Sequence, residues 1–253
     1  MTKNNQRPFG ADNPVNGFSG ASTFSLANGR NKRVGYWRDT WRGSDFDELS
    51  GVYHSFVAMA KDRVAERIAL AQVRGAQTGR VVIRESDERA ARTDYKTTVR
   101  AISKAQGLAE GLRERAASRR EGLRLSAADI APGDFAGAIR RERIRQKLEA
   151  MDAKGQREAL KVADRDVVAA LAEMPLRFSP VPEALHLKVL EDAFERENAD
   201  ALRLVADMEE AAETALRAAD AARAVAREAL GDRLMLDAKE VEPFAADLEA
   251  TGL

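Results

Sequence analysis

The chain offers few residues that could carry out catalysis. It has two histidines, His54 and His186, and no cysteine. His186 follows Glu183 in the pattern Glu-x-x-His, which is half of the ligand set of a di-iron helical bundle. Such a site needs a second Glu-x-x-His and two further glutamates, and no glutamate stands three residues before His54. We therefore expect no metal site and interpret His186 as an ordinary histidine near the start of a helix.

The motifs of common enzyme classes are also missing. The sequence contains no G-x-x-x-x-G-K-[ST] phosphate loop, no G-x-G-x-x-G dinucleotide fingerprint and no G-x-S-x-G nucleophile elbow. Acidic pairs such as Glu209 and Glu210 are expected on an outward helix face. We interpret them as solvated surface residues and not as an acid–base pair. The sequence thus predicts no catalytic residue, no cofactor and no enzymatic activity.

Composition indicates an all-α protein. Ala, Arg, Glu and Leu are abundant and β-branched residues are few, which favours long helices. The N-terminal MTKNNQRPFG lacks the apolar run of a secretory signal, and no stretch reaches the roughly 18 apolar residues of a membrane span. We therefore expect a protein without a membrane span, located in the virion if it comes from a phage and in the cytoplasm otherwise.

Turn residues and apolar periodicity divide the chain into five predicted segments. Helices are expected from Ser44, from Val81 or Ser86 to Glu121, over 134–174, and over 182–230 with Gly231 as the C-terminal cap. The last segment could dock on the helices through its apolar residues or fray. The segments are an extended aromatic and glycine-rich arm (1–43), a basic helical hairpin (44–124), a linker (125–133), a second hairpin with a proline-rich turn at 175–182 (134–231), and an acidic tail (232–253) with Leu234, Leu236, Val241 and Phe244.

Two predicted helices carry apolar seams that alternate in steps of four and three residues, as in coiled coils. The fourth helix would be roughly 70 Å long, which predicts an elongated bundle of about four long helices. Asn198 lies on its seam, where a polar residue usually fixes register. Gly107 and Gly111 interrupt the second helix and suit either a close helix approach or a kink. The seams are Ala91, Tyr95, Thr98, Ile102, Ala105, Ala109, Leu112 and Ala116, and then Leu190, Phe194, Asn198, Ala201, Val205, Met208, Ala212, Ala215, Ala219, Ala222, Ala226 and Ala229.

The net charge of zero conceals two oppositely charged halves. Residues 1–150 carry 28 Lys and Arg against 18 Asp and Glu, whereas residues 151–253 carry 13 against 23. Either helix surfaces simply vary in charge, or the basic half meets an acidic surface of the same chain or of another copy. The arginines expected to contact an acidic surface or nucleic acid are Arg113, Arg115, Arg119, Arg120, Arg140, Arg141, Arg143 and Arg145.

Nucleic-acid binding is the less favoured use of these arginines. Glutamates interrupt both basic runs, RERAASRR (113–120) and IRRERIRQK (139–147), and no recognised nucleic-acid motif accompanies them. The alternative function is a coiled-coil adaptor or regulator that contacts nucleic acid through residues 113–147.

The segment YWRDTW (36–41) holds both tryptophans of the chain. Whether helical or extended, it presents Trp37 and Trp41 on one face with arginines beside them, and Trp, Tyr and Arg are enriched at interface hot spots. The arm either folds back on its own helices or docks on another chain. We expect the second arrangement, with partner-binding residues Phe18, Phe24, Tyr36, Trp37, Arg38, Trp41 and Arg42.

The layout of NGFSGASTFSLANGRNKRVGYWRDTW followed by long Ala/Arg/Glu helices resembles helical virion proteins of tailed bacteriophages, such as internal, ejection or head–tail components. The resemblance implies a non-enzymatic structural subunit present in many copies. Its expected partners are proteins, including other copies of itself.

Overall fold

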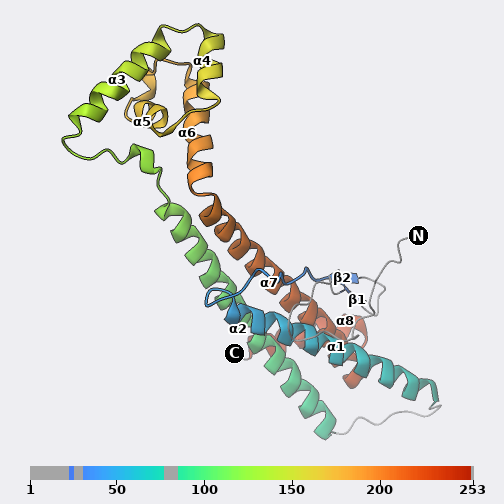
Figure 1. The fold of residues 1–253 in the computed structure, drawn as a ribbon. Coiled ribbons are helices and arrows are strands. Elements are labelled where there is room, and N and C mark those ends of the chain that lie inside the picture. The colour runs from blue at the N-terminus through green and yellow to red at the C-terminus, as the bar shows by residue number, and fades with distance from the viewer. Residues whose placement is uncertain (1–22, 26–30, 77–84, 252–253) are drawn as a thin grey trace. The chain divides into compact units, whose positions relative to one another are not determined.

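The structure, a computed structural model, describes residues 23–25, 31–76 and 85–251 (Figure 1). These residues are mainly helical, which confirms the expected all-α class, but they form eight helices where four long ones were expected. Strands β1 (Thr23–Ser25) and β2 (Asn31–Arg33) pair antiparallel, with Phe24 opposite Lys32. The helices are α1 (Asp47–Ala76), α2 (Glu85–Gly122), α3 (Phe135–Glu149), α4 (Ala153–Leu160), α5 (Arg165–Ala172), α6 (Glu183–Glu197), α7 (Ala199–Leu234) and α8 (Ala238–Ala250), with 3-10 turns η1 (Ser126–Ala128) and η2 (Leu176–Phe178).

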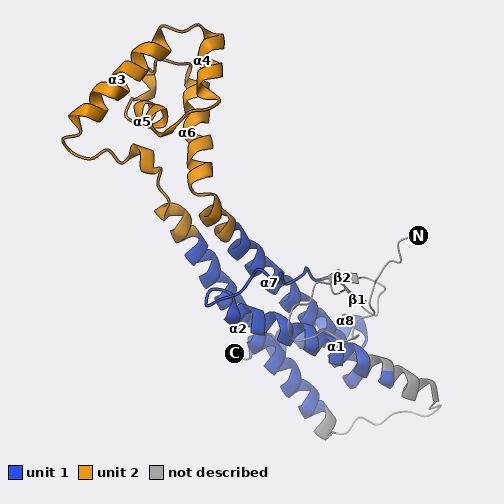
Figure 2. Ribbon diagram, in the orientation of Figure 1, with its two compact units in different colours: residues 1–116, 206–253 blue, residues 117–205 orange. Residues whose placement is uncertain are grey.

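The chain divides into two compact units, shown in different colours in Figure 2. The first unit comprises residues 1–116 and 206–253, and the second comprises residues 117–205. The division falls within α2 and α7, so each of these helices contributes to both units. The first unit therefore joins segments from the two ends of the chain.

The core of the first unit uses the two predicted seams. All eight seam residues of α2, from Ala91 to Ala116, are buried. The second seam is buried on α7 from Val205 to Ala229, whereas its earlier members, which lie on α6, at Asn198 and at the start of α7, are only partly buried. Other faces of α7 are buried as well, at Ala211, Ala218 and Val225. Because alanine is small, neighbouring elements can approach α7 closely, although each buried methyl group contributes little hydrophobic free energy.

Aspartate caps divide the third predicted helix, which is expected over 134–174. Asp134, Asp152 and Asp164 are the N-caps of α3, α4 and α5 and accept hydrogen bonds from the backbone N–H groups of Gly137, Gly155 and Val167. A short aspartate side chain satisfies amides that a helix start leaves without partners. The expectation of one continuous third helix is therefore wrong.

The fourth predicted helix is also interrupted, at Asn198. Its side-chain amide donates to the carbonyl groups of Phe194 at 3.0 Å and Arg124 at 3.1 Å. The backbone at Asn198 leaves the helical conformation, and α7 begins at the next residue. This asparagine ends α6 instead of fixing the register of a continuous helix.

The C-terminal end of α7 differs from the prediction that Gly231 is the cap. The helix continues to Leu234, and Met235 follows with a left-handed φ of 52°. A Cβ on Gly231 would lie 2.5 Å from Cγ2 of Val241, so the glycine allows α8 to pack against α7. Residues 238–250, expected to dock or fray, form a docked helix that begins with a capping box between Asp237 and Glu240.

The second unit packs around α5. Buried residues of α5 meet apolar side chains from α3, α4 and α6. His186 on α6 is 1% exposed and its Nδ1 lies 2.8 Å from Oγ of Ser179. Gln156 donates to the backbone carbonyls of Leu148 and Pro180, both over 3.0 Å. The core residues are Ala127, Leu148, Leu160, Ala163, Val168, Ala169, Leu171, Val181, Val189 and Ala193.

Candidate functional site

Both tryptophans are buried in the chain's own first unit. Trp37 is 6% exposed and Trp41 is 2% exposed. Their rings meet edge to face with centroids 5.2 Å apart, and the Trp37 ring lies 5.4 Å from that of Tyr53 on α1. Edge-to-face aromatic pairs contribute favourable interaction free energy in addition to that gained by burying their apolar surface. The tryptophans therefore form part of the core that covers α1.

Acidic residues on α7 hold the same segment through polar contacts. The indole N–H of Trp41 donates to Oδ1 of Asp207 over 3.1 Å. Arg38 bonds Asp207 over 3.2 Å and Glu210 over 2.7 Å, and Lys32 pairs with Asp220 over 2.6 Å. Residues 32–41 are thereby attached along α7, from Asp207 to Asp220.

The backbone also approaches α7 closely at Gly35. A Cβ there would lie 3.3 Å from Oγ1 of Thr214, tighter than an ordinary contact. The Tyr53 hydroxyl donates to the Gly35 carbonyl over 2.9 Å. Burial raises the pKa of Tyr53 from 10.0 to about 12, so this hydroxyl remains a hydrogen-bond donor above the pH at which an ordinary tyrosine ionises.

These contacts correct the expectation that Trp37 and Trp41 dock on a different chain. Of the two arrangements open from the sequence, the described residues adopt the one in which the arm folds back on its own helices. Arg38 is occupied by α7, whereas Tyr36 and Arg42 are exposed. Phe24 lies in β1, and Phe18 lies outside the described residues.

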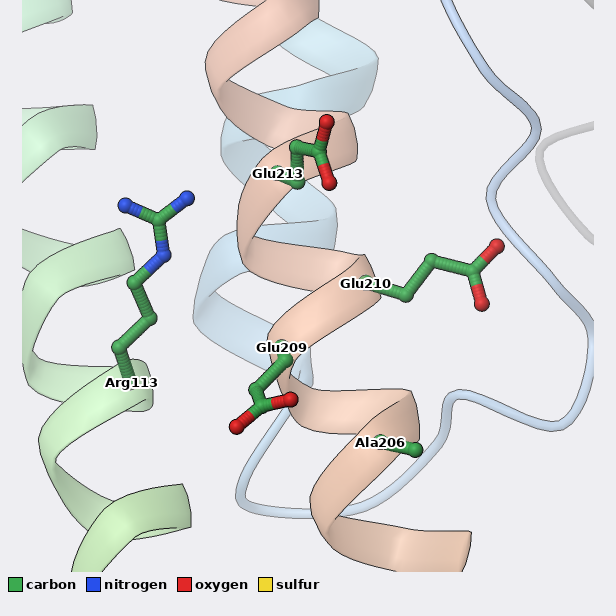
Figure 3. A pocket seen from close by; sticks show the side chains of 5 residues that line it. All are labelled: Arg113, Ala206, Glu209, Glu210 and Glu213. Atoms are coloured by element: carbon green, nitrogen blue, oxygen red, sulfur yellow. The ribbon is translucent and has the colours of Figure 1, made fainter.

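Arg113 stands in an open hollow between α2 and α7 (Figure 3). Glu209, Glu210 and Glu213 of α7 line the hollow with it, and Glu210 points away from α2 and bonds Arg38. Glu213 is paired with Arg217 on its own helix. Ala206 completes the lining. The acidic pair that the sequence places on an outward helix face, Glu209 and Glu210, thus lines an open hollow that also contains an arginine of the basic half.

A second group of predicted arginines forms an ion-pair network in the second unit. Arg141 is buried and bonds Asp134 over 2.9 Å and Glu173 over 3.1 Å. Arg145 bonds the same Glu173 carboxylate over 2.9 Å and Glu142 over 2.8 Å. Hydrogen bonds from Arg145 and Arg141 lower the pKa of Glu173. This network, which we call the α3–α5 network, ties the start of α3 to the end of α5.

The remaining predicted arginines have different surroundings. Arg140 pairs with Asp166 over 3.1 Å, and Arg115 lies 3.8 Å from Asp45. Arg119, Arg120 and Arg143 are exposed. Lys32, Arg38, Arg140 and Arg141 thus each pair with a carboxylate of the acidic half within the same chain.

The sequence reasoning missed a set of exposed apolar residues in the second unit. Phe135 is 80% exposed, and Ile139, one turn later on α3, is also exposed. The sequence could have indicated this pair, because two apolar residues four positions apart at the start of a helix lie on the same helix face. The full set is Phe135, Ile139, Val162, Leu176, Phe178 and Leu187, which we call the exposed apolar set.

Neither histidine belongs to a metal site in the described part of the chain. No group of three or more His, Asp or Glu side chains there could hold an ion. Burial lowers the pKa of His186 and of His54. Among the described helices, none combines the length and the apolar character needed to cross a bilayer. Comparisons with protein-family models, curated proteins and solved structures give no match.

Proposed function

We propose that this chain is a non-enzymatic structural subunit of a larger assembly, a virion component of a tailed bacteriophage, in which copies of the chain pack together. The observation that carries the proposal is the exposed apolar set of the second unit. Within it, Phe135 and Ile139 are four residues apart on α3 and therefore lie on one helix face. Contiguous exposed apolar surface on a protein commonly marks an interaction site.

Phe135 and Ile139 are the leading contact residues of this set. Phe135 keeps most of its ring surface in solvent although it begins a helix whose other side packs on α5. Aromatic rings contribute much of the free energy of protein interfaces. We therefore assign the outward face of α3 to a protein partner, and the first partner to test is another copy of this chain.

The proposal retains arm docking only for residues that are not part of the chain's own core. Tyr36 and Arg42 are exposed and can reach a neighbour, and Phe18 and Phe24 remain candidates. The same proposal includes coiled-coil packing of the α2 and α7 seams and lateral association of the helices. Nucleic-acid binding through 113–147 is less well supported, since Arg140, Arg141 and Arg145 are engaged with carboxylates.

The native mass of the full chain tests the proposal. We expect light scattering and native mass spectrometry to find oligomers whose fraction increases with concentration, because association follows mass action. The double change Phe135→Ser, Ile139→Ser should reduce that fraction, while its helix content and thermal unfolding stay close to those of the original chain. Ala136→Ser, Gln146→Ser, at exposed positions of the same helix, is the matched control. A chain that is monomeric at every concentration would contradict self-assembly.

A further inference from the structure

Helix α8 covers an apolar face that α2 and α7 form together. Ala91 and Tyr95 on α2 and Ala226 and Leu230 on α7 belong to one buried cluster with two residues of α8. The two are Ala245 and Leu248, and Phe244 of α8 packs at the edge of the same cluster. In the closed chain, α8 therefore covers this α2–α7 face.

Charged contacts select α8 as the occupant of this face. Glu249 accepts a hydrogen bond from the Tyr95 hydroxyl over 2.7 Å and is paired with Arg223. Arg227 pairs with Glu242 over 2.9 Å. A helix without acidic groups at these positions would leave the two arginines without these partners. Pairing of this kind gives specificity as well as affinity.

The connection between α7 and α8 is short and strained. It consists of residues 235–237, and Met235 has a φ of 52°. Among the described residues, Met235 is the one non-glycine residue with a positive φ. That conformation is costly for a residue with a Cβ. The Met235 side chain is about half exposed, so little burial offsets the cost. The three connecting residues include neither glycine nor proline, so each of them can also adopt a helical conformation.

We propose that α8 exchanges between two copies of this chain. In the exchanged form residues 235–237 become helical and join α7 to α8, and α8 lies on the α2–α7 face of the second copy. The contacts of Glu249, Glu242 and Phe244 are then made between chains, and the strain at Met235 is released. The exchange is reciprocal, as in a domain-swapped dimer. It goes beyond the proposed function because it defines one self-interaction surface, which does not depend on the exposed apolar set.

An engineered disulfide can report the exchange because the chain has no cysteine. A Cβ on Gly231 would lie 3.8 Å from Cβ of Val241, a separation that suits a disulfide. The full chain with Gly231→Cys, Val241→Cys is equilibrated under reducing conditions at concentrations from ~10 μM to ~1 mM and then oxidised, since exchange follows mass action. Closed chains give monomers with an internal disulfide, and exchanged chains give covalent dimers with two disulfides. Val241→Cys alone measures random cross-linking.

We expect the fraction of doubly bonded covalent dimer to increase with concentration above this background. Internally bonded monomer at every concentration would overturn the proposal. The exposed-set variant Phe135→Ser, Ile139→Ser should leave this fraction unchanged, so the proposed function and the exchange can fail separately.

A matched pair at Met235 tests the role of the strained connection. Met235→Gly relieves the strain of the closed form and weakens the joined helix, so the dimer association constant should fall by at least about tenfold. Met235→Ala keeps the Cβ strain and favours helix, so the constant should stay the same or rise. Light scattering over a dilution series measures both constants. Equal constants for the two variants, or a higher one for the glycine variant, would overturn the proposal.

Discussion

Trp41 donates its indole N–H to the carboxylate of Asp207 over 3.1 Å, although the two residues are 166 positions apart in the chain. The same carboxylate accepts a hydrogen bond from Arg38 over 3.2 Å. One acidic side chain of α7 therefore holds both an aromatic and a basic residue of the YWRDTW segment. These contacts indicate that the segment stabilises the first unit.

Trp41→Ala should destabilise the isolated chain. The change removes a ring that is 2% exposed and leaves a cavity, which costs about 3 to 5 kcal/mol for a buried tryptophan. Urea unfolding followed by circular dichroism measures the loss. Tyr36→Ala, at an exposed position of the same segment, is the control and should change the free energy of unfolding by no more than about 0.5 kcal/mol. Equal effects of the two changes would contradict burial of Trp41 in its own chain.

The fluorescence of Trp37 and Trp41 should already report burial in the dilute chain. Because both indoles are buried, their emission should be blue-shifted and resistant to quenching by iodide. Unfolding in urea should shift the emission to longer wavelength and expose it to the quencher. Red-shifted, quenchable emission before unfolding would indicate that the segment is detached from α7.

Substitutions of Asp207 separate its hydrogen bond from its charge. Asp207→Asn keeps an oxygen acceptor for the Trp41 indole and loses mainly the exposed pair with Arg38, which contributes at most about 1 kcal/mol. Asp207→Ala leaves a buried indole N–H without its acceptor and should cost about 1 to 3 kcal/mol. Thermal unfolding of both variants measures the difference. A larger loss for the asparagine variant would contradict this assignment.

Gly231 and Gly107 should respond to alanine in opposite directions. At Gly231 the new methyl group would meet Val241, so Gly231→Ala should loosen α8 and lower the melting temperature. No described atom of a neighbouring element lies within 4 Å of a Cβ at Gly107, which argues against the close helix approach, one of the two arrangements open from the sequence. Gly107→Ala should therefore stabilise α2 by about 0.5 to 1 kcal/mol, because alanine is the better helix former. Calorimetry of the two variants compares the effects directly.

Acid should weaken the second unit through the α3–α5 network. The pKa of Glu173 is lowered by hydrogen bonds from Arg145 and Arg141, and the pKa of Asp134 is lowered chiefly by Arg141. Both carboxyl groups bind protons more weakly in the folded chain, so their stabilising effect is present above the unfolded pKa of about 4. It is lost as the pH falls through the lower folded pKa.

Thermal unfolding measured between about pH 7 and pH 2 should reveal this dependence. Glu173→Gln should lower the melting temperature at neutral pH and reduce its decrease in acid. Glu149→Gln, at the exposed end of α3, controls for the removal of one carboxylate. An unchanged acid dependence in the Glu173 variant would show that the network does not carry the effect.

Local sequence patterns were sufficient to predict the all-α fold class and the apolar seam of α2. All eight predicted seam residues of α2 are buried. They could be predicted because the residues of one helix face recur at three- and four-residue spacing along the sequence. The breaks before α4 and α5 depend on single aspartates, Asp152 and Asp164, without a proline or a glycine run to mark them. An aspartate is equally at home on a helix surface, so its capping role depends on the backbone around it.

The partner of the tryptophans could not be predicted from local sequence. Trp41 meets Asp207 because its segment packs on α7 within the first unit, and no spacing rule connects residues that far apart. The exposed positions of Phe135 and Ile139 have the same origin, since burial is decided by which elements pack together. Which apolar residues occur in these segments can be read from the sequence, whereas tertiary contacts determine which of them face solvent.

The alanine-rich part of α7 leaves its axial position weakly determined by packing. Ten of the nineteen residues from 211 to 229 are alanine, so a slide of seven residues would again bring alanine to most seam positions. Polar contacts along the helix remove this ambiguity, among them the pairs of Asp220 with Lys32 and of Arg227 with Glu242. Asp207 meets Trp41 near one end, and Arg233 bonds Glu66 over 2.6 Å and Asp94 over 2.9 Å near the other. If those contacts were removed together, α7 could occupy several translational positions of similar energy.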